Sequence, residues 1–320
     1  MLYLGRDEIF ESVEVEELID VIESSIELYE SGNYKMPTRL HMDYSENTLL
    51  LMPSSAERSV GTKLVNLTPK NQEKEIPVIQ GCYILNDTDS GKILSIMEGS
   101  SLTALRTGAV GSVAIKHMTP KSIDSLGVIG AGVQGFHQAL FVLKIRDLTE
   151  VWVYDLDDTQ MKEFRERLLK EKEDIDVYMA DSSKELVKES EVVITTTTSS
   201  EPVIPDESDI IEGKHFIGIG SYKPNMREFS KAIFKEVQNV FIDTEDAIEE
   251  TGDLVTPLEE GWINEEQIYT IGKLLNQEVG VNPNSTTFFK SVGMALFDLV
   301  TANLIYKKAK ELEKGKEIVF

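Results

Sequence analysis

The chain has 320 residues, of which 41% are apolar and 28% are charged, a composition typical of a folded globular protein. At roughly 100–200 residues per domain, this length corresponds to one large domain or two modest ones. The 56 acidic and 32 basic side chains give a net charge of −24, which argues against a nucleic-acid or anionic membrane partner.

The first third of the chain has the pattern of one helix followed by several strands. Apolar residues at helical spacing, with acidic residues opposite them, predict an amphipathic helix over 14–30. Short polar turns then separate four strand-like runs, at 49–52, 60–67, 78–85 and 92–97. Because residues 86–91 are typical of a hairpin turn, we expect these strands to form an antiparallel sheet. A helical pattern over 99–117 follows.

After residue 120 the pattern becomes a regular alternation of strands and helices. Short apolar runs predict strands at 126–129, 151–154, 177–179, 192–195, 216–219 and 240–242. Helical patterns lie between the first of these runs, which is the βαβ rhythm of a doubly wound parallel sheet.

The last long helix is expected to run from about residue 286 to 313, where its end is rich in Lys and Glu. It is too long to be merely the final helix of the sheet domain, so we expect it to return to the N-terminal domain. The predicted fold is therefore α/β, with two domains. Residues 1–118 with 300–320 form a discontinuous α+β domain, and residues 119–299 form the parallel-sheet domain.

A glycine motif follows the strand at 126–129 and opens a helical pattern. It comprises Gly130, Gly132 and Gly135 with Val133 and Gln134 between them. In this strand–turn–helix context it is a Rossmann dinucleotide-binding fingerprint. Gly130 permits the tight turn, Gly132 lets the backbone approach a pyrophosphate, and Gly135 allows the helix to pack closely on the strand. The helix N-terminus offers N–H groups to the phosphates.

An acidic residue in the expected place completes this fingerprint. Asp155 ends the next strand, 20 residues after Gly135. Its carboxylate can accept hydrogen bonds from the adenosine ribose and would repel a 2′-phosphate, so the sequence favours NAD(H) over NADP(H).

Hydroxyl side chains end two later strands of the same predicted sheet. Thr195 and Thr197 belong to a run of four threonines, and Ser221 ends the run Gly218–Ser221. Carboxyl ends of such strands face the cofactor crevice, which makes these residues candidate cofactor contacts. The alternative is that threonine simply favours strands, and the sequence leaves both readings open.

Three cations stand out in this acidic chain. By strand alternation Lys63 shares a face with Val65 and Leu67, and by helical spacing Arg106 shares a face with Leu102 and other apolar residues. Arg39 lies at the start of a strand. Each is either paired with an acid or available to an anionic ligand. Beside a nicotinamide, a guanidinium suits a substrate carboxylate, and a lysine of lowered pKa can exchange protons with an amine or imine.

Other site chemistries lack a pattern in the sequence. The four histidines have no metal-ligand spacing, and Cys82 is the one cysteine, so no metal site and no intrachain disulfide are expected. The N-terminus does not read as an export signal, and charged residues interrupt every long apolar run, so we expect a cytoplasmic protein without a membrane span.

Four segments together resemble one known family, the ornithine cyclodeaminase/mu-crystallin family, along essentially the whole chain. They are 63–66, 102–109, 127–135 and 290–293. The "LTALRT" segment joined to a "GxGxQG" fingerprint is much more specific than the fingerprint alone. The resemblance implies a homodimer built through the N-terminal domain, and an active site facing the nicotinamide.

Residue by residue, the resemblance implies roles for several side chains named above. Arg39, Lys63 and Arg106 match the family's substrate-binding positions, with Arg106 on the α-carboxylate and Lys63 in carboxylate contact or proton transfer. The positions that match cofactor contacts are Val133, Gln134, Asp155, Thr195 and Ser291.

One departure from the family concerns the acid/base group of ornithine cyclodeaminase. That enzyme has an Asp after the strand equivalent to 216–220, and the alignment places Tyr222 there, which makes Tyr222 the candidate catalytic group at this position. Unless Glu228 or another acid substitutes, no carboxylate is available to steer a distal amine. The departure puts cyclodeamination in doubt but not hydride transfer.

We therefore expect an NAD(H)-dependent oxidoreductase acting on the Cα–N bond of a small amino or imino acid. Reduction of a cyclic ketimine, such as pyrroline- or piperideine-2-carboxylate, is the leading reaction. Ornithine cyclodeamination is the first alternative, an alanine-type dehydrogenase the second, and a non-catalytic nucleotide- or ligand-binding protein the third.

Overall fold

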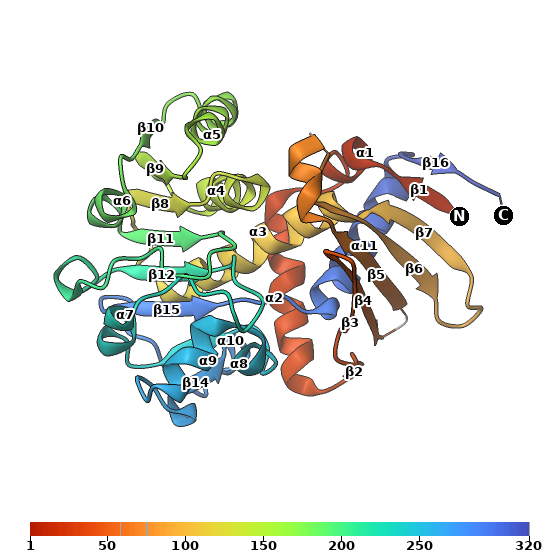
Figure 1. The fold of residues 1–320 in the computed structure, drawn as a ribbon. Helices are drawn as coiled ribbons and strands as arrows, with labels where there is room; N and C mark the ends of the chain where they lie inside the picture. Colours follow the sequence, from red (N-terminus) through yellow and green to blue (C-terminus); the bar gives the residue numbers. More distant parts are fainter. Residues whose placement is uncertain (58, 75, 320) are drawn as a thin grey trace. The chain divides into compact units, whose positions relative to one another are not determined.

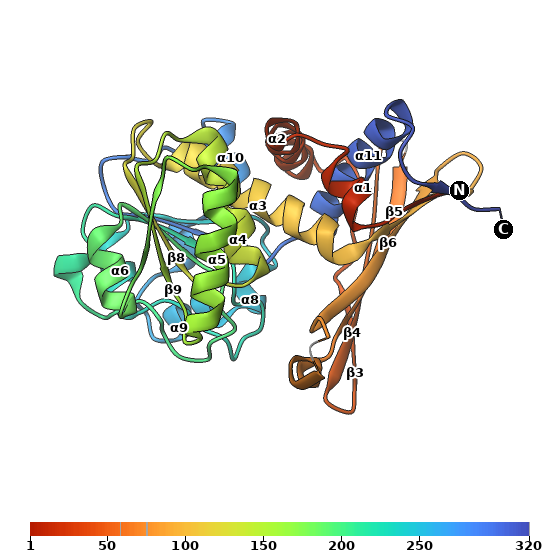
Figure 2. The same cartoon turned by 90° about the horizontal axis from the view of Figure 1, so that it is seen from above.

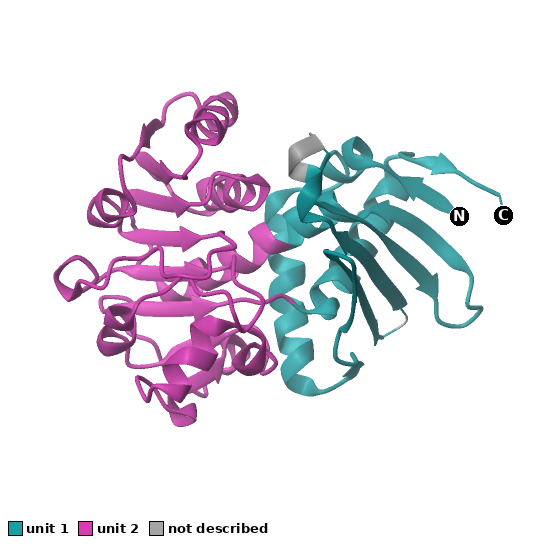
Figure 3. Cartoon of the chain, viewed as in Figure 1, with its two compact units in different colours: residues 1–106, 294–320 teal, residues 107–293 magenta. Residues whose placement is uncertain are grey.

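The computed structural model describes residues 1–57, 59–74 and 76–319. The chain forms two compact units, coloured separately in Figure 3. Unit 1 comprises Met1–Arg106 with Met294–Phe320, and unit 2 comprises Thr107–Gly293. These borders differ from the expected ones, after residue 118 and before residue 300. Helix α3 (Gly99–Met118) begins in unit 1 and ends in unit 2, so the first border falls within a helix that the sequence pattern shows as continuous.

Unit 1 is built on a mainly antiparallel sheet with the order β16-β1-β7-β6-β5-β4-β2, and β3 also pairs with β4 (Figure 1). Its central hairpins confirm the four predicted strands. Strand β1 was not predicted; it pairs parallel with β7 and antiparallel with β16, so the two ends of the chain meet in this sheet. The strands are β1 Leu2–Leu4, β2 Tyr34–Lys35, β3 Leu40–Tyr44, β4 Asn47–Ala56, β5 Ser59–Leu67, β6 Ile79–Asp87, β7 Ile93–Glu98 and β16 Lys316–Glu317.

Two long helices cover one face of this sheet. Helix α11 (Ala295–Glu311) packs against β4, β5 and β6, and α2 (Val15–Ser31) packs against α11 (Figure 2). Helix α2 confirms the predicted amphipathic helix; a capping box between Glu14 and Glu17 begins it, and Gly32 in the left-handed region ends it. The other helical segments are α1 (Arg6–Phe10) and the 3₁₀ turn η1 (Pro69–Lys74).

Unit 2 contains a wholly parallel sheet with the order β10-β9-β8-β11-β12-β15-β13-β14. The order reverses between β8 and β11, which confirms the doubly wound fold and places a ligand crevice at the carboxyl ends of these two strands. The strands are β8 Ser125–Ile129, β9 Glu150–Tyr154, β10 Asp176–Met179, β11 Val192–Thr195, β12 His215–Gly218, β13 Val240–Ile242, β14 Ile268–Thr270 and β15 Thr287–Lys290.

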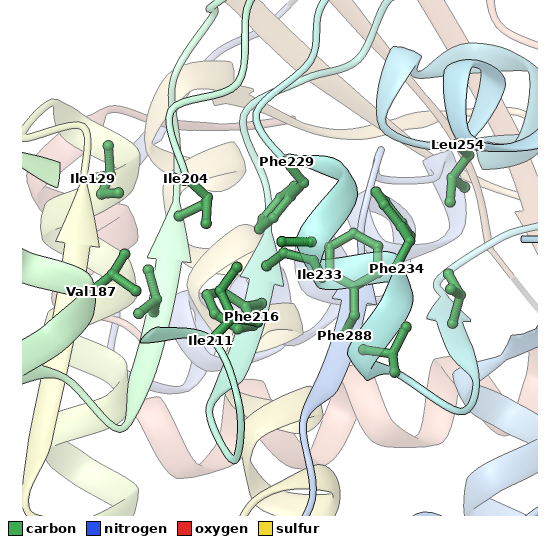
Figure 4. Packing of buried hydrophobic residues seen from close by; sticks show 14 of the residues in the cluster. Ile129, Val187, Ile204, Ile211, Phe216, Phe229, Ile233, Phe234, Leu254 and Phe288 are labelled. Carbon is green, nitrogen blue, oxygen red and sulfur yellow. The ribbon is translucent and has the colours of Figure 1, made fainter. Parts of the chain in front are cut away.

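Helices connect these strands and close the core of unit 2. In Figure 4 the rings of Phe229, Phe234 and Phe288 lie against one another, with centroids 4.7 and 5.4 Å apart on the two sides of Phe288. No helix among the described residues is long and apolar enough to cross a membrane. The helices and 3₁₀ turns are α4 Val133–Ile145, α5 Asp158–Glu171, α6 Ser183–Glu189, η2 Ser208–Ile210, α7 Lys231–Glu236, α8 Ala247–Glu250, α9 Gly252–Glu259, η3 Glu265–Gln267 and α10 Ile271–Leu275.

The expected continuous helix from 286 to 313 is wrong in its first part. Residues Thr287–Lys290 form β15, buried in the sheet between β12 and β13, and α11 begins only at Ala295. Thr287, Phe288 and Phe289 favour a strand, and Gly293 has φ +76°. A short apolar run next to a helical pattern does not show by periodicity where the strand stops and the helix starts.

Candidate active site

The glycine loop between β8 and α4 has the geometry expected of a nucleotide-binding turn. Gly130 has φ +103°, a conformation that L side chains rarely adopt. A Cβ on Gly135 would lie 2.0 Å from the carbonyl oxygen of Gly130, so only glycine lets α4 start this close to β8. A Cβ on Gly132 would meet nothing within 4 Å, so the backbone there borders open space.

The first turn of α4 is equipped to receive an anionic group. Gly132 is the N-cap and supplies no side-chain acceptor to the first amides of the helix. Val133 is 54% exposed, and Gln134 Oε1 is buried without a hydrogen-bond partner among the described residues. Together these features fit the pyrophosphate of a dinucleotide.

Asp155 lies directly after β9, beside the glycine loop. Its Oδ2 accepts a hydrogen bond from the backbone N–H of Ala131 at 2.7 Å, and its Oδ1 accepts one from Asp157 at 3.1 Å. The sequence predicted a ribose ligand here. The structure adds that the same carboxylate also fixes the glycine loop, which keeps its charge near the place that a 2′-phosphate would occupy in NADP(H).

The predicted threonines lie at the carboxyl end of β11, next to the point where the strand order reverses. Thr195 is fully buried, and its Oγ1 has no hydrogen-bond partner among the described residues. Thr197 donates both its backbone N–H, at 2.6 Å, and its Oγ1, at 2.9 Å, to Glu228. The hydroxyl of Thr197 is thus engaged within the protein, and its contact with a cofactor stays a prediction.

The predicted serines are engaged in the same way. Ser221 is fully buried, and its hydroxyl donates to Asp253. Ser291 donates to Asp243 at 2.6 Å, which also accepts the backbone N–H of Gly293 at 2.7 Å. Both serines therefore order the loops that follow β12 and β15, and direct cofactor contact by either one stays a prediction.

In unit 1, two of the predicted substrate cations meet one carboxylate. Lys63 on β5 places its Nζ 2.8 Å from Oδ2 of Asp298 on α11, and Arg106 on α3 places its Nε 3.3 Å from Oδ1 of the same residue. The lysine, the arginine and the aspartate are 3%, 8% and 0% exposed. The trio carries one net positive charge when all three are ionised, which suits one substrate carboxylate.

The electrostatics of this trio favour proton exchange at neutral pH. Burial is the main cause that lowers the pKa of Lys63 to about 8. The Asp298 carboxylate opposes this shift, while the positive charges of Arg106 and Arg39 add to it. The buried Tyr83 phenol has a raised pKa, first through burial and then through the charge of Asp298, so it stays neutral. Lys63 is therefore the group here that can gain and lose a proton.

Asp298 is a functional candidate that the sequence analysis missed. It lies three residues after Ala295 and four before Ala302. That spacing places it on the buried face of the helix, where an acid requires a partner. Among the cations that the sequence predicts to be buried, Lys63 is a candidate for that partner.

The resemblance to the family aligns Tyr222 with the aspartate of ornithine cyclodeaminase, and Glu228 is the acid nearby in sequence that could substitute for it. Tyr222 is half-buried, and burial raises the pKa of its phenol. Glu228 is fully buried and accepts hydrogen bonds from the backbone of Thr197, Gly220 and Ser221. Because both of its oxygens are engaged, Glu228 is poorly suited to serve a substrate amine. Among the described residues, no group of three or more His, Cys, Asp or Glu side chains could hold a metal ion.

Comparisons with known proteins identify the family of this chain. The model of the Ornithine cyclodeaminase/mu-crystallin family matches residues 2–313. A Delta(1)-pyrroline-2-carboxylate reductase of Bacillus cereus is 31% identical, and the match covers all of both chains.

Two solved structures are also similar over nearly the whole chain. One is Thermococcus litoralis Delta(1)-pyrroline-2-carboxylate reductase in complex with NADH and L-proline, with a TM-score of 0.93, 31% identity and coverage of 99% of this chain and 100% of that one. The other is an archaeal alanine dehydrogenase dimer with bound NAD, with a TM-score of 0.91, 27% identity and coverage of 100% and 99%.

Proposed function

The chain belongs to the ornithine cyclodeaminase/mu-crystallin family, and we propose that it is an NAD(H)-dependent reductase of cyclic ketimines such as pyrroline-2-carboxylate and piperideine-2-carboxylate. The observation that carries the proposal is the buried trio of Lys63, Asp298 and Arg106, which combines a carboxylate receptor with a proton donor. A curated relative and a solved structure that each match this chain over their full length and are 31% identical to it are reductases of pyrroline-2-carboxylate, which belongs to this substrate class.

The nucleotide would be held by unit 2. The amides at the start of α4 and the open backbone at Gly132 suit its pyrophosphate, and Asp155 suits its adenosine ribose. When bound, the reduced nicotinamide supplies a hydride. Thr195, Thr197, Ser221 and Ser291 are proposed to line or order the nicotinamide end of this site, because they lie at or just beyond the carboxyl ends of the strands.

The substrate would be held by unit 1. Arg106, with Arg39, binds the carboxylate and offsets its charge, because a guanidinium can form two parallel hydrogen bonds to a carboxylate. Lys63 would donate a proton to the ring nitrogen, and Cα would gain a hydride from the bound nicotinamide. One hydride and one proton together convert C=N into CH–NH. Asp298 keeps Lys63 charged by opposing the effect of burial on its pKa.

Ornithine cyclodeamination is less well supported by the site. It requires a group that receives the distal amine, and the position of the family aspartate holds Tyr222. An alanine-type dehydrogenase remains the second candidate, because the archaeal alanine dehydrogenase has a closely similar fold. Reductive amination of pyruvate with ammonium and NADH tests it: a turnover higher than that with cyclic ketimines would favour the dehydrogenase. A protein that binds NADH but turns over neither would be the non-catalytic alternative.

We propose that the protein is a homodimer through unit 1. Every side chain of β3 is exposed, although it is a strand of the sheet, and three of them are large and apolar: Leu40, Met42 and Tyr44 at 53%, 49% and 42%. A second copy of the chain would remove this apolar surface from water. Light scattering after gel filtration measures the mass of the assembly, and Met42→Glu should yield the monomer.

We also propose a cytoplasmic location for the protein, which the single cysteine fits.

Replacing Asp155 with alanine should weaken NADH binding by about 10- to 100-fold, because a hydrogen bond to a charged group contributes roughly 1.5–3 kcal/mol. Fluorescence titration with NADH measures this without any substrate. The matched control is Asp157→Ala, which removes a neighbouring carboxylate that caps α5 through Thr159. It should lower thermal stability while NADH affinity stays within about threefold of the wild type. Equal NADH affinity in both variants would remove Asp155 from the ribose contact.

Replacing Asp298 with asparagine should lower stability by about 3–5 kcal/mol, because it leaves two buried cations without their counter-ion. The same change removes the charge that raises the pKa of Lys63, so this pKa falls further below 8 and the alkaline limb of kcat/KM moves to lower pH. As a control, Asp147→Asn breaks an exposed ion pair with Lys172 and should change neither quantity measurably. An unmoved limb in folded Asp298→Asn would refute this link.

A further inference from the structure

Three charged side chains lie buried together in unit 2 and have no part in the reaction described above. Lys290, the last residue of β15, places its Nζ 3.3 Å from Asp253 Oδ2 and 3.8 Å from Glu228 Oε2. All three side chains are 0% exposed. Burying charge is costly even when it is paired, and an apolar group could fill the same volume, so the arrangement calls for a reason besides packing.

Glu228 joins the loops that follow two neighbouring strands. Its Oε1 accepts the backbone N–H of Thr197 at 2.6 Å and the hydroxyl of the same residue at 2.9 Å. Its Oε2 accepts the backbone N–H groups of Gly220 and Ser221, at 2.9 and 3.1 Å. Thr197 comes two residues after β11, and Gly220 comes two residues after β12. One carboxylate thus fixes the backbone beyond both strands.

Asp253 and Lys290 hold Glu228 in place. Asp253 Oδ1 accepts the backbone N–H groups of Glu228 and Phe229, at 2.7 and 3.0 Å, and its Oδ2 accepts the Ser221 hydroxyl. The ammonium of Lys290 lies near both carboxylates and offsets their mutual repulsion. Burial raises the pKa of Glu228, and the charge of Lys290 opposes this rise. The three side chains therefore depend on one another.

The loops held by Glu228 lie at the functional edge of the sheet. Doubly wound sheets bind nucleotides at the carboxyl ends of their strands, near the point where the strand order reverses, and β11 flanks that point. We propose that Glu228, Asp253 and Lys290 are positioning residues that set the backbone after β11 and β12 for NAD(H). They act through that backbone, because none of them is exposed. The inference rests on the proposed function for the identity of the site.

The first test is Glu228→Gln, measured by the dissociation constant of NADH and by kcat and KM. Glutamine keeps the shape but cannot accept all four hydrogen bonds, so at least one buried N–H group loses its partner. We expect a protein that is folded at the assay temperature, with NADH affinity and kcat/KM lowered by about tenfold or more, because a buried N–H group without its acceptor no longer holds the backbone after β11 or β12 in place. A lower melting temperature is expected as well and does not by itself support the proposal.

The matched control is Glu191→Gln at the opposite edge of the same sheet. Glu191 precedes β11 and accepts the backbone N–H groups of Asp124 and Ser125, where β8 begins. Glu191→Gln and Glu228→Gln thus make the same chemical change, because each converts a carboxylate that accepts backbone N–H groups into an amide. Glu191→Gln should lower the melting temperature and leave NADH affinity and kcat/KM within about twofold of the wild type. If both variants lose NADH affinity alike, or neither does, the cluster serves stability alone and the proposal is wrong.

A second variant and a variant-free measurement cover the case in which Glu228→Gln does not fold. Asp253→Asn combined with Lys290→Met removes one negative and one positive charge together, and the asparagine still accepts the backbone hydrogen bonds of Glu228 and Phe229. It should also weaken NADH binding. In the unmodified protein, NADH should slow hydrogen exchange at the amides of Thr197 and Gly220 more than at Ser125. Equal slowing would overturn the proposal. Because NADH binding is measured without substrate, these results stand even if no imine is reduced.

Discussion

Replacing Arg106 with alanine should lower kcat/KM for a cyclic ketimine by about 30-fold to several thousandfold. The range corresponds to roughly 2–5 kcal/mol, the usual cost of removing one partner from a buried charge pair. Arg106 is 8% exposed and shares Asp298 with Lys63, so alanine removes the carboxylate receptor and leaves the lysine as the single cation on Asp298. NADH affinity should stay within about twofold, because the nucleotide residues belong to unit 2.

Two further arginine variants make this result specific. Arg106→Lys keeps the charge but loses the planar fork, so it should recover only part of the activity. Arg146→Ala removes a half-buried guanidinium whose Nη2 donates to the backbone carbonyls of Ile115 and Lys116 at the end of α3. It should reduce stability and leave kcat unchanged. Near-normal turnover by Arg106→Ala would remove Arg106 from the carboxylate role.

Replacing Lys63 with methionine should lower kcat by about 100- to 10,000-fold, the usual contribution of a positioned proton donor. Methionine keeps much of the volume at a site that is 3% exposed, so the loss reports the missing ammonium rather than a cavity. Lys184→Met is the matched control, because it breaks an exposed pair with Glu207 and should leave kcat unchanged.

The pH dependence gives an independent view of the same residue. Burial lowers the pKa of Lys63 to about 8, so the side chain is a proton donor below that value and loses its proton above it. Reduction should therefore be fastest on the acidic side and decline as the pH rises through about 8. In Lys63→Met the residual rate should lack this decline. A decline that persists unchanged in the variant would assign it to another group.

The sequence was informative wherever a local pattern carries the chemistry. Strand alternation placed Lys63 on the buried face of β5, and helical spacing placed Arg106 on the buried face of α3, as the structure shows. The glycine loop was predictable because its turn, its strand and its helix are contiguous. In each case the residues that determine the local geometry belong to the same strand or helix, or to elements that follow one another directly in the sequence.

The rest of the site depends on contacts between distant parts of the chain. Asp298 lies 235 positions from Lys63, and no local pattern joins them. The groups that donate hydrogen bonds to the Glu228 carboxylate come from two loops, so its role in fixing Thr197 is visible only once β11 and β12 are side by side. The strand β15 was mistaken for helix because burial on both faces removes the alternation that marks a strand.

The most direct test of the proposed function is NADH oxidation by the purified protein with pyrroline-2-carboxylate, followed at the nicotinamide absorbance. A parallel reaction contains L-ornithine and catalytic NAD and is assayed for ammonia and proline. We expect NADH consumption with proline formation from the imine, and no ammonia from ornithine. Ammonia and proline from ornithine without net change in NADH would contradict the proposed function and establish a cyclodeaminase, with Tyr222 or another group in place of the family aspartate.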